Sequence, residues 1–190
     1  SAGWRLSEEA FMKNLNIFDD LKLRVSYGTV GNQGGIDRYD GIQLYNFNQN
    51  KGALIGDEKI SYIDTNGKLL SMDREWETIQ NYNIGLDFGL FGNRLKGTAE
   101  LFWKVCENML IDVSYPATLG DKAPTANVGS FKANGFEGNL NWSDKIGKVG
   151  YSIGGTFTYT TNKLTDNGGS ATITDGVRSD REGYPLNSVL

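Results

Sequence analysis

The most constraining feature of this sequence is a regular alternation of apolar and polar residues over several long segments. In residues 21–28, apolar side chains at odd positions alternate with polar residues or glycine at even positions. The same period of two recurs in residues 82–90, 95–105, 136–142 and 149–159. Because successive side chains of a β-strand point to opposite faces, the pattern predicts strands with one apolar and one polar face. The 25 glycines also disfavour helix interiors, so we expect an all-β fold of antiparallel strands.

Strand length and connection length separate this pattern from that of an ordinary soluble sandwich. The alternating segments run for roughly 8 to 13 residues, close to the ~9–11 residues of a membrane-spanning strand and above the usual ~5–6. Residues 91–94 and 143–148 read as tight turns, whereas residues 28–78 and 106–130 read as long connections. Short turns at one rim and long loops at the other are typical of outer-membrane β-barrels. We therefore expect an open, curved antiparallel meander that forms part of a large transmembrane β-barrel.

Aromatic residues mark both ends of the predicted apolar faces, as in the interfacial girdles of barrels. They are Trp142 and Tyr151 near the short turns, and Tyr27, Tyr82, Trp103 and Tyr159 near the long connections. We expect an outward, convex face that carries Leu86, Phe88, Leu101, Trp103, Leu140, Ile153 and Phe157. We expect an inward, concave face that carries Asp87, Glu100, Glu137 and Thr156. The alternative is a soluble or surface-exposed β-sandwich that binds carbohydrate, whose core would hold the same aromatic rings.

The composition excludes several function classes. The sequence has no histidine, which excludes Ser-His-Asp catalysis, Cys-His catalysis and histidine metal sites. Cys106 is the only cysteine, so neither an intrachain disulfide nor a cysteine metal cage forms. A net charge of −4 argues against a nucleic-acid-binding surface. We therefore expect no enzyme, assign no catalytic, cofactor-binding or metal-binding residue, and leave the substrate-binding residues unassigned.

Charged residues on the predicted polar faces are the best candidates for a functional group of residues in this sequence. They are Lys22, Arg24, Asp87, Lys96, Glu100 and Glu137. They could line a selective lumen or contact a plug, or they could simply pair across strands at roughly 0.2–1 kcal/mol per pair, and we favour pairing. The aromatic residues of the long connections could stack on sugar rings or pack locally, so none is assigned to a site; these are Tyr39, Tyr45, Phe47 and Tyr62.

Two local elements are also expected. Residues 8–13 predict a helical turn at the short-turn rim, after a first strand that ends near Arg5. Residues 60–70 predict a small hairpin, because Asn66 and Gly67 readily supply the two positive φ values of a type I′ turn.

Several segments, in this order along the chain, resemble SusC/RagA-type TonB-dependent outer-membrane transporters. They are Ser1–Glu9 and Leu21–Gly28 followed by Gly31-Asn32-Gln33, Trp76-Glu77-Thr78 leading to Asn83–Phe91, Asn127–Ser130 running into Asn134–Glu137, and Arg181–Ser188. The matches touch nearly the whole chain. One departure is Val105-Cys106-Glu107, where the family leads us to expect polar or basic residues, and we interpret Cys106 as a tolerated substitution at a loop edge.

The resemblance implies a barrel of about 22 strands closed around a plug, of which residues 1–190 would be a partial β-barrel domain with six or seven strands. We expect a fragment, because no plug, TonB-contacting segment or signal peptide is recognisable. The implied function is nutrient uptake, namely import of oligosaccharides or peptides across the cell outer membrane of a Bacteroidota-like bacterium. The implied partners are a SusD-like surface lipoprotein, the TonB complex through the missing N-terminal region, outer-membrane lipid and the substrate, but no nucleic acid. The resemblance implies no cofactor.

Overall fold

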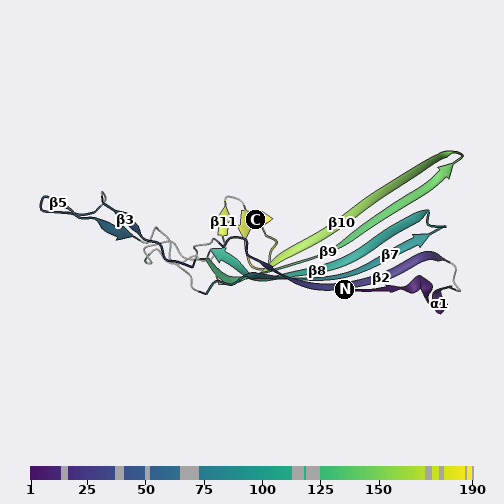
Figure 1. The fold of residues 1–190 in the computed structure, drawn as a ribbon, viewed down its shortest axis with the longest axis horizontal. Helices are drawn as coiled ribbons and strands as arrows, with labels where there is room; N and C mark the ends of the chain where they lie inside the picture. Colours follow the sequence, from purple (N-terminus) through teal and green to yellow (C-terminus); the bar gives the residue numbers. More distant parts are fainter. Residues whose placement is uncertain are drawn as a thin grey trace.

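The main feature of the fold is one six-stranded antiparallel sheet (Figure 1). The computed structural model describes residues 1–13, 17–36, 41–49, 52–64, 73–112, 118, 125–169, 173–175, 178–186 and 188–189. The strands lie in the order β1 (Ala2–Arg5), β2 (Phe18–Asn32), β7 (Glu77–Leu90), β8 (Leu95–Asp112), β9 (Thr125–Ile146) and β10 (Val149–Asn167). Each neighbouring pair is antiparallel. This confirms the all-β meander with six main strands.

Smaller elements lie at the two ends of the sheet (Figure 1). At the short-turn end, η1 (Leu6–Glu8) and α1 (Ala10–Lys13) join β1 to β2, which confirms the expected helical turn. Beyond the long-loop end lie two small pairs, β3 (Asn46–Asn48) with β6 (Tyr62–Asp64) and β4 (Leu54–Ile55) with β5 (Glu58–Lys59). Beside that end lies a three-stranded sheet of β11 (Ile173–Asp175), β12 (Arg178–Asp180) and β13 (Ser188–Val189). In the region expected to form a hairpin, β6 pairs with β3, whereas Asn66 and Gly67 lie outside the described residues.

The long strands extend further than the alternation predicts. The strands β2, β7, β8, β9 and β10 contain 14 to 22 residues each. The connection expected from Cys106 to Ser130 is therefore too long, because β8 continues to Asp112 and β9 starts at Thr125. Backbone pairing needs no apolar face, so strands can continue into polar sequence, here with a register shift between Cys106 and Leu110 that interrupts the period of two.

The turns at the short-turn end agree with the prediction in one case and differ in the other. Residues 91–94 form the expected turn, with positive φ at Phe91, Gly92 and Asn93. The turn expected over residues 143–148 is shorter, because Ile146 pairs directly with Val149. Only Gly147 and Lys148 lie between the strands, and the φ of +62° at Gly147 suits the first central residue of a two-residue type II′ hairpin.

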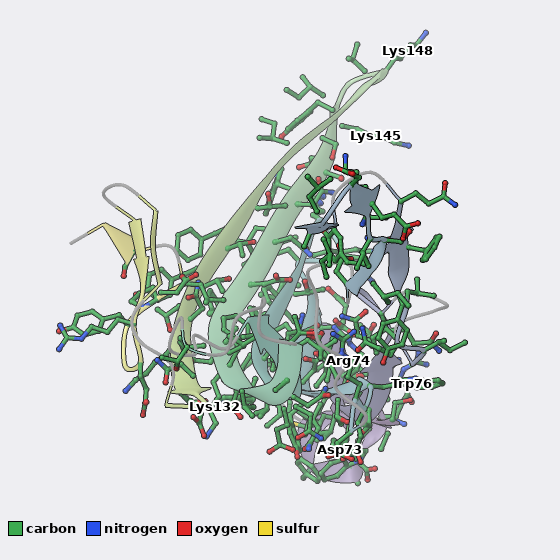
Figure 2. All side chains as sticks on the ribbon, turned by 90° about the vertical axis from the view of Figure 1, so that its left-hand side faces the viewer. Asp73, Arg74, Trp76, Lys132, Lys145 and Lys148 are labelled. Atoms are coloured by element: carbon green, nitrogen blue, oxygen red, sulfur yellow. The ribbon has the colours of Figure 1, made fainter. Side chains whose placement is uncertain are left out.

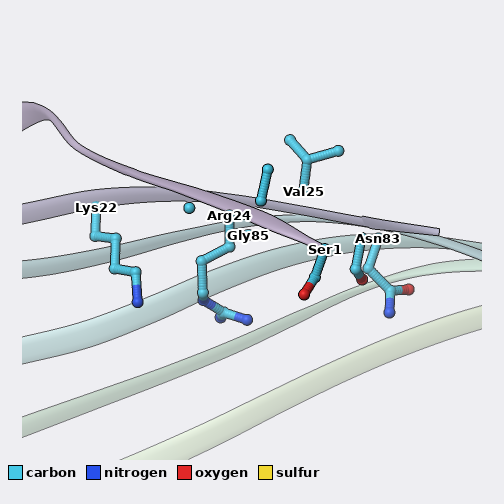
Figure 3. Close-up of a pocket in the computed structure, with 9 residues that line it drawn as sticks. Ser1, Lys22, Arg24, Val25, Asn83 and Gly85 are labelled. Atoms are coloured by element: carbon cyan, nitrogen blue, oxygen red, sulfur yellow. The ribbon is translucent and has the colours of Figure 1, made fainter.

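The strand register sorts the side chains onto two faces. One face, called the apolar face below, carries Leu86, Phe88, Leu101, Trp103, Leu140, Ile153 and Phe157, as expected. The other, called the polar face, carries Asp87, Glu100, Glu137 and Thr156. In Figure 3, Val25 of the apolar face points away from Lys22 and Arg24 of the polar face. The two predicted sets therefore do lie on opposite sides of the sheet.

The apolar face remains open to its surroundings. Ile153 is 71% exposed and Phe157 is 60% exposed. Among the described residues, the sheets other than the six-stranded one have only two or three strands, so no comparable sheet packs on this face as a β-sandwich core would require. The β-sandwich alternative is therefore not favoured. No helix among the described residues is long and apolar enough to cross a membrane.

The few buried hydrophobic residues include one that the sequence analysis placed incorrectly. Cys106 is 6% exposed and lies within β8, between Ile79 of β7 and Phe131 of β9. It is therefore not at a loop edge. A small, weakly polar thiol behaves as a hydrophobe in such a position, which explains why cysteine fits there.

Candidate functional site

Aromatic residues of the apolar face line up across neighbouring strands at the long-loop end. Tyr27 of β2 lies opposite Tyr82 of β7, and Tyr82 lies opposite Trp103 of β8. The rings of Tyr27 and Tyr82 are 4.8 Å apart between centroids, with an interplanar angle of 37°. The hydroxyl of Tyr27 accepts a hydrogen bond from Thr29, and that of Tyr82 donates one to Gln80. Each ring thus has an apolar body and a satisfied polar tip directed to the long-loop side, as at a membrane–water interface.

A second group of aromatic residues borders the apolar face at the short-turn end. The rings of Phe91 and Trp142 are 6.1 Å apart between centroids. Tyr151 lies opposite Asp144, whose carboxylate is 3.4 Å from the guanidinium of Arg94. Aromatic rings next to an ion pair again match the composition expected where an apolar band meets water.

The distance between the two aromatic rows fits a lipid bilayer. Both rows can be located on β9. Trp103 of the long-loop row lies opposite Asn134, and Tyr151 of the short-turn row lies opposite Asp144, ten residues further along the strand. Ten residues at about 3.4 Å each cover roughly 34 Å along the strand. With the ~45° tilt of a barrel strand this becomes about 24 Å along the membrane normal, close to the ~25 Å apolar band of outer-membrane barrels. The apolar face therefore has the height and the border residues of a lipid-facing wall.

On the polar face, three of the predicted charged residues form one network across β2, β7 and β8. Arg24 Nε donates to Asp87 Oδ2 at 2.8 Å, and Arg24 Nη2 donates to Asp87 Oδ1 at 3.0 Å. Arg24 Nη2 also donates to Glu100 Oε2 at 3.3 Å. Arg24 reaches β8 because Gly85 lies between Arg24 and Glu100 in register, and a Cβ at Gly85 would stand 2.9 Å from Arg24 Nη2. The structure thus joins Arg24, Asp87 and Glu100 in one cross-strand network, called the staple below. This is the charge pairing across strands that we favoured from the sequence.

The other three charged residues lie on the same face outside this network. Lys22 lies opposite Asp87, and Lys96 lies opposite Gly89 and Asn141. Glu137 lies directly opposite Glu100, a like-charge pair that costs stability. Arg24 bonds to one member of that pair and so offsets part of the repulsion.

A shallow hollow of about 290 Å³ lies next to this network, beside β1 (Figure 3). It is lined by Lys22, Arg24, Asn83 and the first residues of the chain. In Figure 3 the side chains of Lys22, Arg24 and Asn83 point to the same side of the ribbon. The hollow offers hydrogen-bond donors and two cationic side chains, of which Arg24 is already paired with Asp87 and Glu100, and it lies on the polar side of the wall.

Hydrogen bonds at the long-loop end tie strands and connections together, and sequence reasoning did not find most of them. Glu77 accepts from Asn32 Nδ2 at 2.6 Å and from the Leu110 backbone N–H at 3.0 Å, so it links β2 to β8 at the start of β7. Asn127 of β9 exchanges two hydrogen bonds with the backbone of Glu75, at 2.7 and 2.8 Å. The only sequence signal for these contacts is that Glu77 and Asn127 fall in segments that resemble the transporter family.

The aromatic residues of the long loop are placed away from the main sheet, as far as they are described. Phe47 lies in β3 opposite Ile63, and Tyr62 lies in β6 opposite Asn48. A hydrogen bond to the carboxylate of Asp64 raises the pKa of the Tyr62 hydroxyl, with desolvation and the charge of Asp64 adding to the effect. Tyr45 is exposed, and Tyr39 lies outside the described residues. These residues do not converge on one described pocket.

The described part of the chain holds no candidate metal site. There, no group of three or more Cys, Asp and Glu side chains is arranged to hold a metal ion. What the described residues do offer is a two-sided wall, with an apolar band on one side and a stapled polar surface on the other.

Comparison with known proteins gives consistent matches over nearly the whole chain. A family model described as TonB dependent receptor-like, beta-barrel, matches residues 1–189. TonB-dependent receptor SusC of Bacteroides thetaiotaomicron is 29% identical over 165 residues, which cover 86% of this chain and 16% of SusC. TonB-dependent receptor P26 of Formosa agariphila is 34% identical over 146 residues, which cover 74% of this chain and 14% of P26.

Solved structures agree in fold. The chain resembles a structure of the RagAB peptide transporter with a TM-score of 0.79 and 27% identity, over 98% of this chain and 20% of that one. A structure of the RagAB peptide importer in the closed-closed state gives a TM-score of 0.81 at 28% identity, with the same coverage. The chain therefore spans about a fifth or less of the length of these relatives.

Proposed function

Since this chain belongs to the TonB-dependent receptor family, within its β-barrel region, we propose that it forms a wall segment of an outer-membrane nutrient transporter. The observation that carries the proposal is the pair of aromatic rows on the apolar face, which enclose a band about 24 Å high. In this proposal residues 1–190 form part of one β-barrel domain. The apolar face contacts lipid, and the polar face contacts the interior of the barrel.

The proposed role in transport is mechanical and electrostatic rather than catalytic. The staple of Arg24, Asp87 and Glu100 holds β2, β7 and β8 in register on the inner side. A carboxylate–guanidinium pair with two parallel hydrogen bonds is directional as well as strong, so it suits a wall that must keep its shape while cargo passes. The wall itself needs no cofactor for this role.

We propose import of oligosaccharides or peptides, in partnership with a SusD-like surface lipoprotein and energised through TonB, in a Bacteroidota-like bacterium. Two likenesses support this: the matched relatives include a receptor named SusC, and the matched solved structures are described as a peptide transporter. The long-loop end carries the small sheets β3 to β6 and β11 to β13, and that end is the extracellular side of an outer-membrane barrel. The surface lipoprotein would meet the protein on this side.

The test begins with the location and activity of the full protein that contains these residues. We expect it to fractionate with the outer membrane, to need detergent for extraction, and to co-purify with a SusD-like lipoprotein. Deleting its gene should abolish growth on one class of oligosaccharide or peptide, and restoring the gene should rescue growth. Recovery of the full protein in the soluble fraction would refute the proposal.

A further inference from the structure

The polar face changes character at the long-loop end, where it carries a row of apolar side chains. The row crosses five strands, since each member lies opposite the next in register: Val30 of β2, Ile79 of β7, Cys106 of β8, Phe131 of β9 and Leu164 of β10. Leu164 is only 2% exposed. Because lipid lies on the other face of the sheet, Leu164 is covered from within the chain.

The segment that reaches Leu164 consists of residues 181–186, called the strap below. The Leu164 backbone N–H donates to the Tyr184 carbonyl at 3.0 Å, and the Gly183 N–H donates to the Leu164 carbonyl at 2.8 Å. The Leu186 N–H donates to Asn162 Oδ1 at 3.0 Å. Asn162 is two residues from Leu164 along β10, so its side chain also lies on the polar face. Three hydrogen bonds therefore hold the strap against the edge and the inner side of β10.

The strap lies on the route that cargo takes into a barrel. Viewed from the long-loop end, β11, β12 and β13 lie beside the β10 edge of the sheet, whereas Trp76, which precedes β7, lies on the other side (Figure 2). The long-loop end is the extracellular side of an outer-membrane barrel. The strap is therefore a fixed part of the extracellular mouth, on its β10 side.

The strap presents an aromatic ring in a defined setting. The Tyr184 N–H donates to the Arg181 carbonyl at 3.1 Å, and the φ of +91° at Gly183 suits the third residue of a type II turn. The Arg181 guanidinium lies over the Tyr184 ring, 5.4 Å from its centroid. Tyr184 is still 43% exposed, which leaves the other face of the ring open. Glu182 balances the charge of Arg181, so this turn carries no net charge.

The inner surface below the strap is polar and almost uncharged. Thr160, Thr158 and Thr156 follow Asn162 along the polar face of β10, and all three are exposed. Opposite these four residues, the only charged side chain on β9 is that of Glu137. Hydroxyl and amide groups donate and accept hydrogen bonds without requiring charge on a ligand. An open aromatic face packs against C–H groups. Together they match a neutral sugar, whereas a peptide brings charged termini for which this surface offers only Glu137.

We propose that the strap is a fixed cargo contact at the mouth of the barrel, where one unit of a neutral oligosaccharide stacks on the open face of Tyr184. Arg181 is a positioning residue, because it acts by holding the ring. The inference rests on the proposed function, since it requires the polar face to line the passage. It deepens that function by naming a contact residue and by choosing sugar over peptide.

The first experiment measures cargo binding by the full transporter, purified with its lipoprotein partner in detergent. Isothermal titration calorimetry with maltohexaose, cellohexaose, xylohexaose and mannohexaose finds the sugar that binds, and a panel of mixed hexapeptides is titrated in parallel. Tyr184→Ala should weaken binding of that sugar roughly two- to twelvefold, the contribution of one stacked aromatic pair. Tyr184→Phe keeps the ring and should change binding less than twofold. Tyr151→Ala is the matched control, because it removes a similarly exposed ring from the short-turn end of the apolar face.

Arg181 is tested through the ring that it holds. Arg181→Gln should weaken binding less than Tyr184→Ala does, and Arg181→Lys should restore it by returning a cation to the ring. In the Tyr184→Ala background, Arg181→Gln should have no further effect. The electrophoretic shift between heated and unheated samples reports folding of each variant. If Tyr184→Ala lowers the folded fraction, Tyr184→Leu removes the ring while keeping an apolar side chain.

The second experiment tests where the strap lies and whether it is fixed. Asn162→Cys combined with Leu186→Cys should form a disulfide in whole cells, because Asn162 Oδ1 lies 3.0 Å from the Leu186 nitrogen. Thr161→Cys with Leu186→Cys is the control and should not, since Thr161 lies on the apolar face. Sugar binding should be the same before and after the disulfide is reduced.

Each outcome decides the question. Weaker sugar binding in Tyr184→Ala, with normal binding in Tyr184→Phe and Tyr151→Ala, supports the proposal. Binding of the peptides alone, of no hexasaccharide, or of sugar equally by Tyr184→Ala and the unmodified protein overturns it. Absence of the Asn162–Leu186 cross-link, or binding that returns only on reduction, overturns the fixed position of the strap. Failure of the proposed function would appear separately, as recovery of the full protein outside the outer membrane.

Discussion

Replacing Leu140 by arginine tests whether the apolar face spans a bilayer. Leu140 lies on the apolar face opposite Gly97 of β8 and Gly155 of β10. It is six residues from Asn134 of the long-loop aromatic row and four from Asp144 of the short-turn row. At about 3.4 Å per residue and a tilt of ~45°, it lies roughly 14 Å below the first row, near the middle of the band.

The depth of each position sets the expected magnitude. An arginine at the bilayer midplane of a barrel costs about 2–4 kcal/mol, so Leu140→Arg should lower the folded-to-unfolded ratio about 30- to 700-fold. Leu101 lies only two residues from Trp103, roughly 5 Å below the same row. Leu101→Arg should therefore cost about 1–2 kcal/mol, between the midplane and interface values. Thr156→Arg lies at nearly the depth of Leu140 but on the polar face, and it should stay within about 0.5 kcal/mol.

The assay follows refolding of the full protein into lipid vesicles over a series of urea concentrations. The electrophoretic shift of unheated samples gives the folded fraction. Leu140→Ala separates the loss of the leucine side chain from the cost of placing a charge in lipid. Equal costs for Leu140→Arg and Thr156→Arg would refute the assignment of faces, and a larger cost for Leu101→Arg than for Leu140→Arg would refute the assignment of depth.

Three further predictions follow from the packing. Arg24→Gln leaves Asp87 and Glu100 without their guanidinium partner and should cost about 1 kcal/mol in the same assay, because the groups are partly exposed. Adding Glu100→Gln should recover part of that loss by relieving Glu137 opposite, and strictly additive costs would contradict the staple. Gly97→Ala should cost about 1–3 kcal/mol, since its Cβ would stand 2.5 Å from Phe88 and 2.8 Å from the Asn139 carbonyl oxygen. Gly28→Ala is its control, and equal stability of the two would show that β8 shifts at no cost. The 190-residue chain alone should aggregate in buffer without detergent, because its apolar face and its sheet edges are exposed, and a monodisperse, cooperatively folding monomer in size-exclusion chromatography and circular dichroism would contradict this.

The two faces of the sheet could be predicted from the sequence because a period of two fixes them independently of what lies opposite. Leu101 and Glu100 occupy opposite faces in any antiparallel pairing that keeps the alternation. The aromatic borders could be predicted for the same reason, since they lie at the ends of alternating segments. Strand ends were predicted less well, because the extension of β8 to Asp112 is stabilised by backbone pairing that leaves no hydrophobic pattern.

Contacts between distant parts of the chain could not be predicted from local pattern. Glu75 and Asn127 are 52 residues apart in sequence and meet only because β7, β8 and β9 bring the ends of their connections together. The reach of Arg24 over Gly85 to Glu100 depends on the register of three strands, which a single alternating segment does not determine. The position of Cys106 was misjudged for a related reason, since its burial comes from neighbours on β7 and β9.

The way in which the chain returns to β10 affects how this protein can change in evolution. The backbone N–H of Leu164 donates to the carbonyl of Tyr184, and the N–H of Gly183 donates to the carbonyl of Leu164. After β10 the chain runs through β11 and β12 and then returns to contact Leu164. Both ends of this segment therefore lie close together, at the edge of β10 that does not pair with β9. Doubling the length of a loop whose ends are already held together costs only about 0.6 kcal/mol. New surface can thus be inserted at this position, and shaped by selection for new contacts, while the wall beneath it is unchanged.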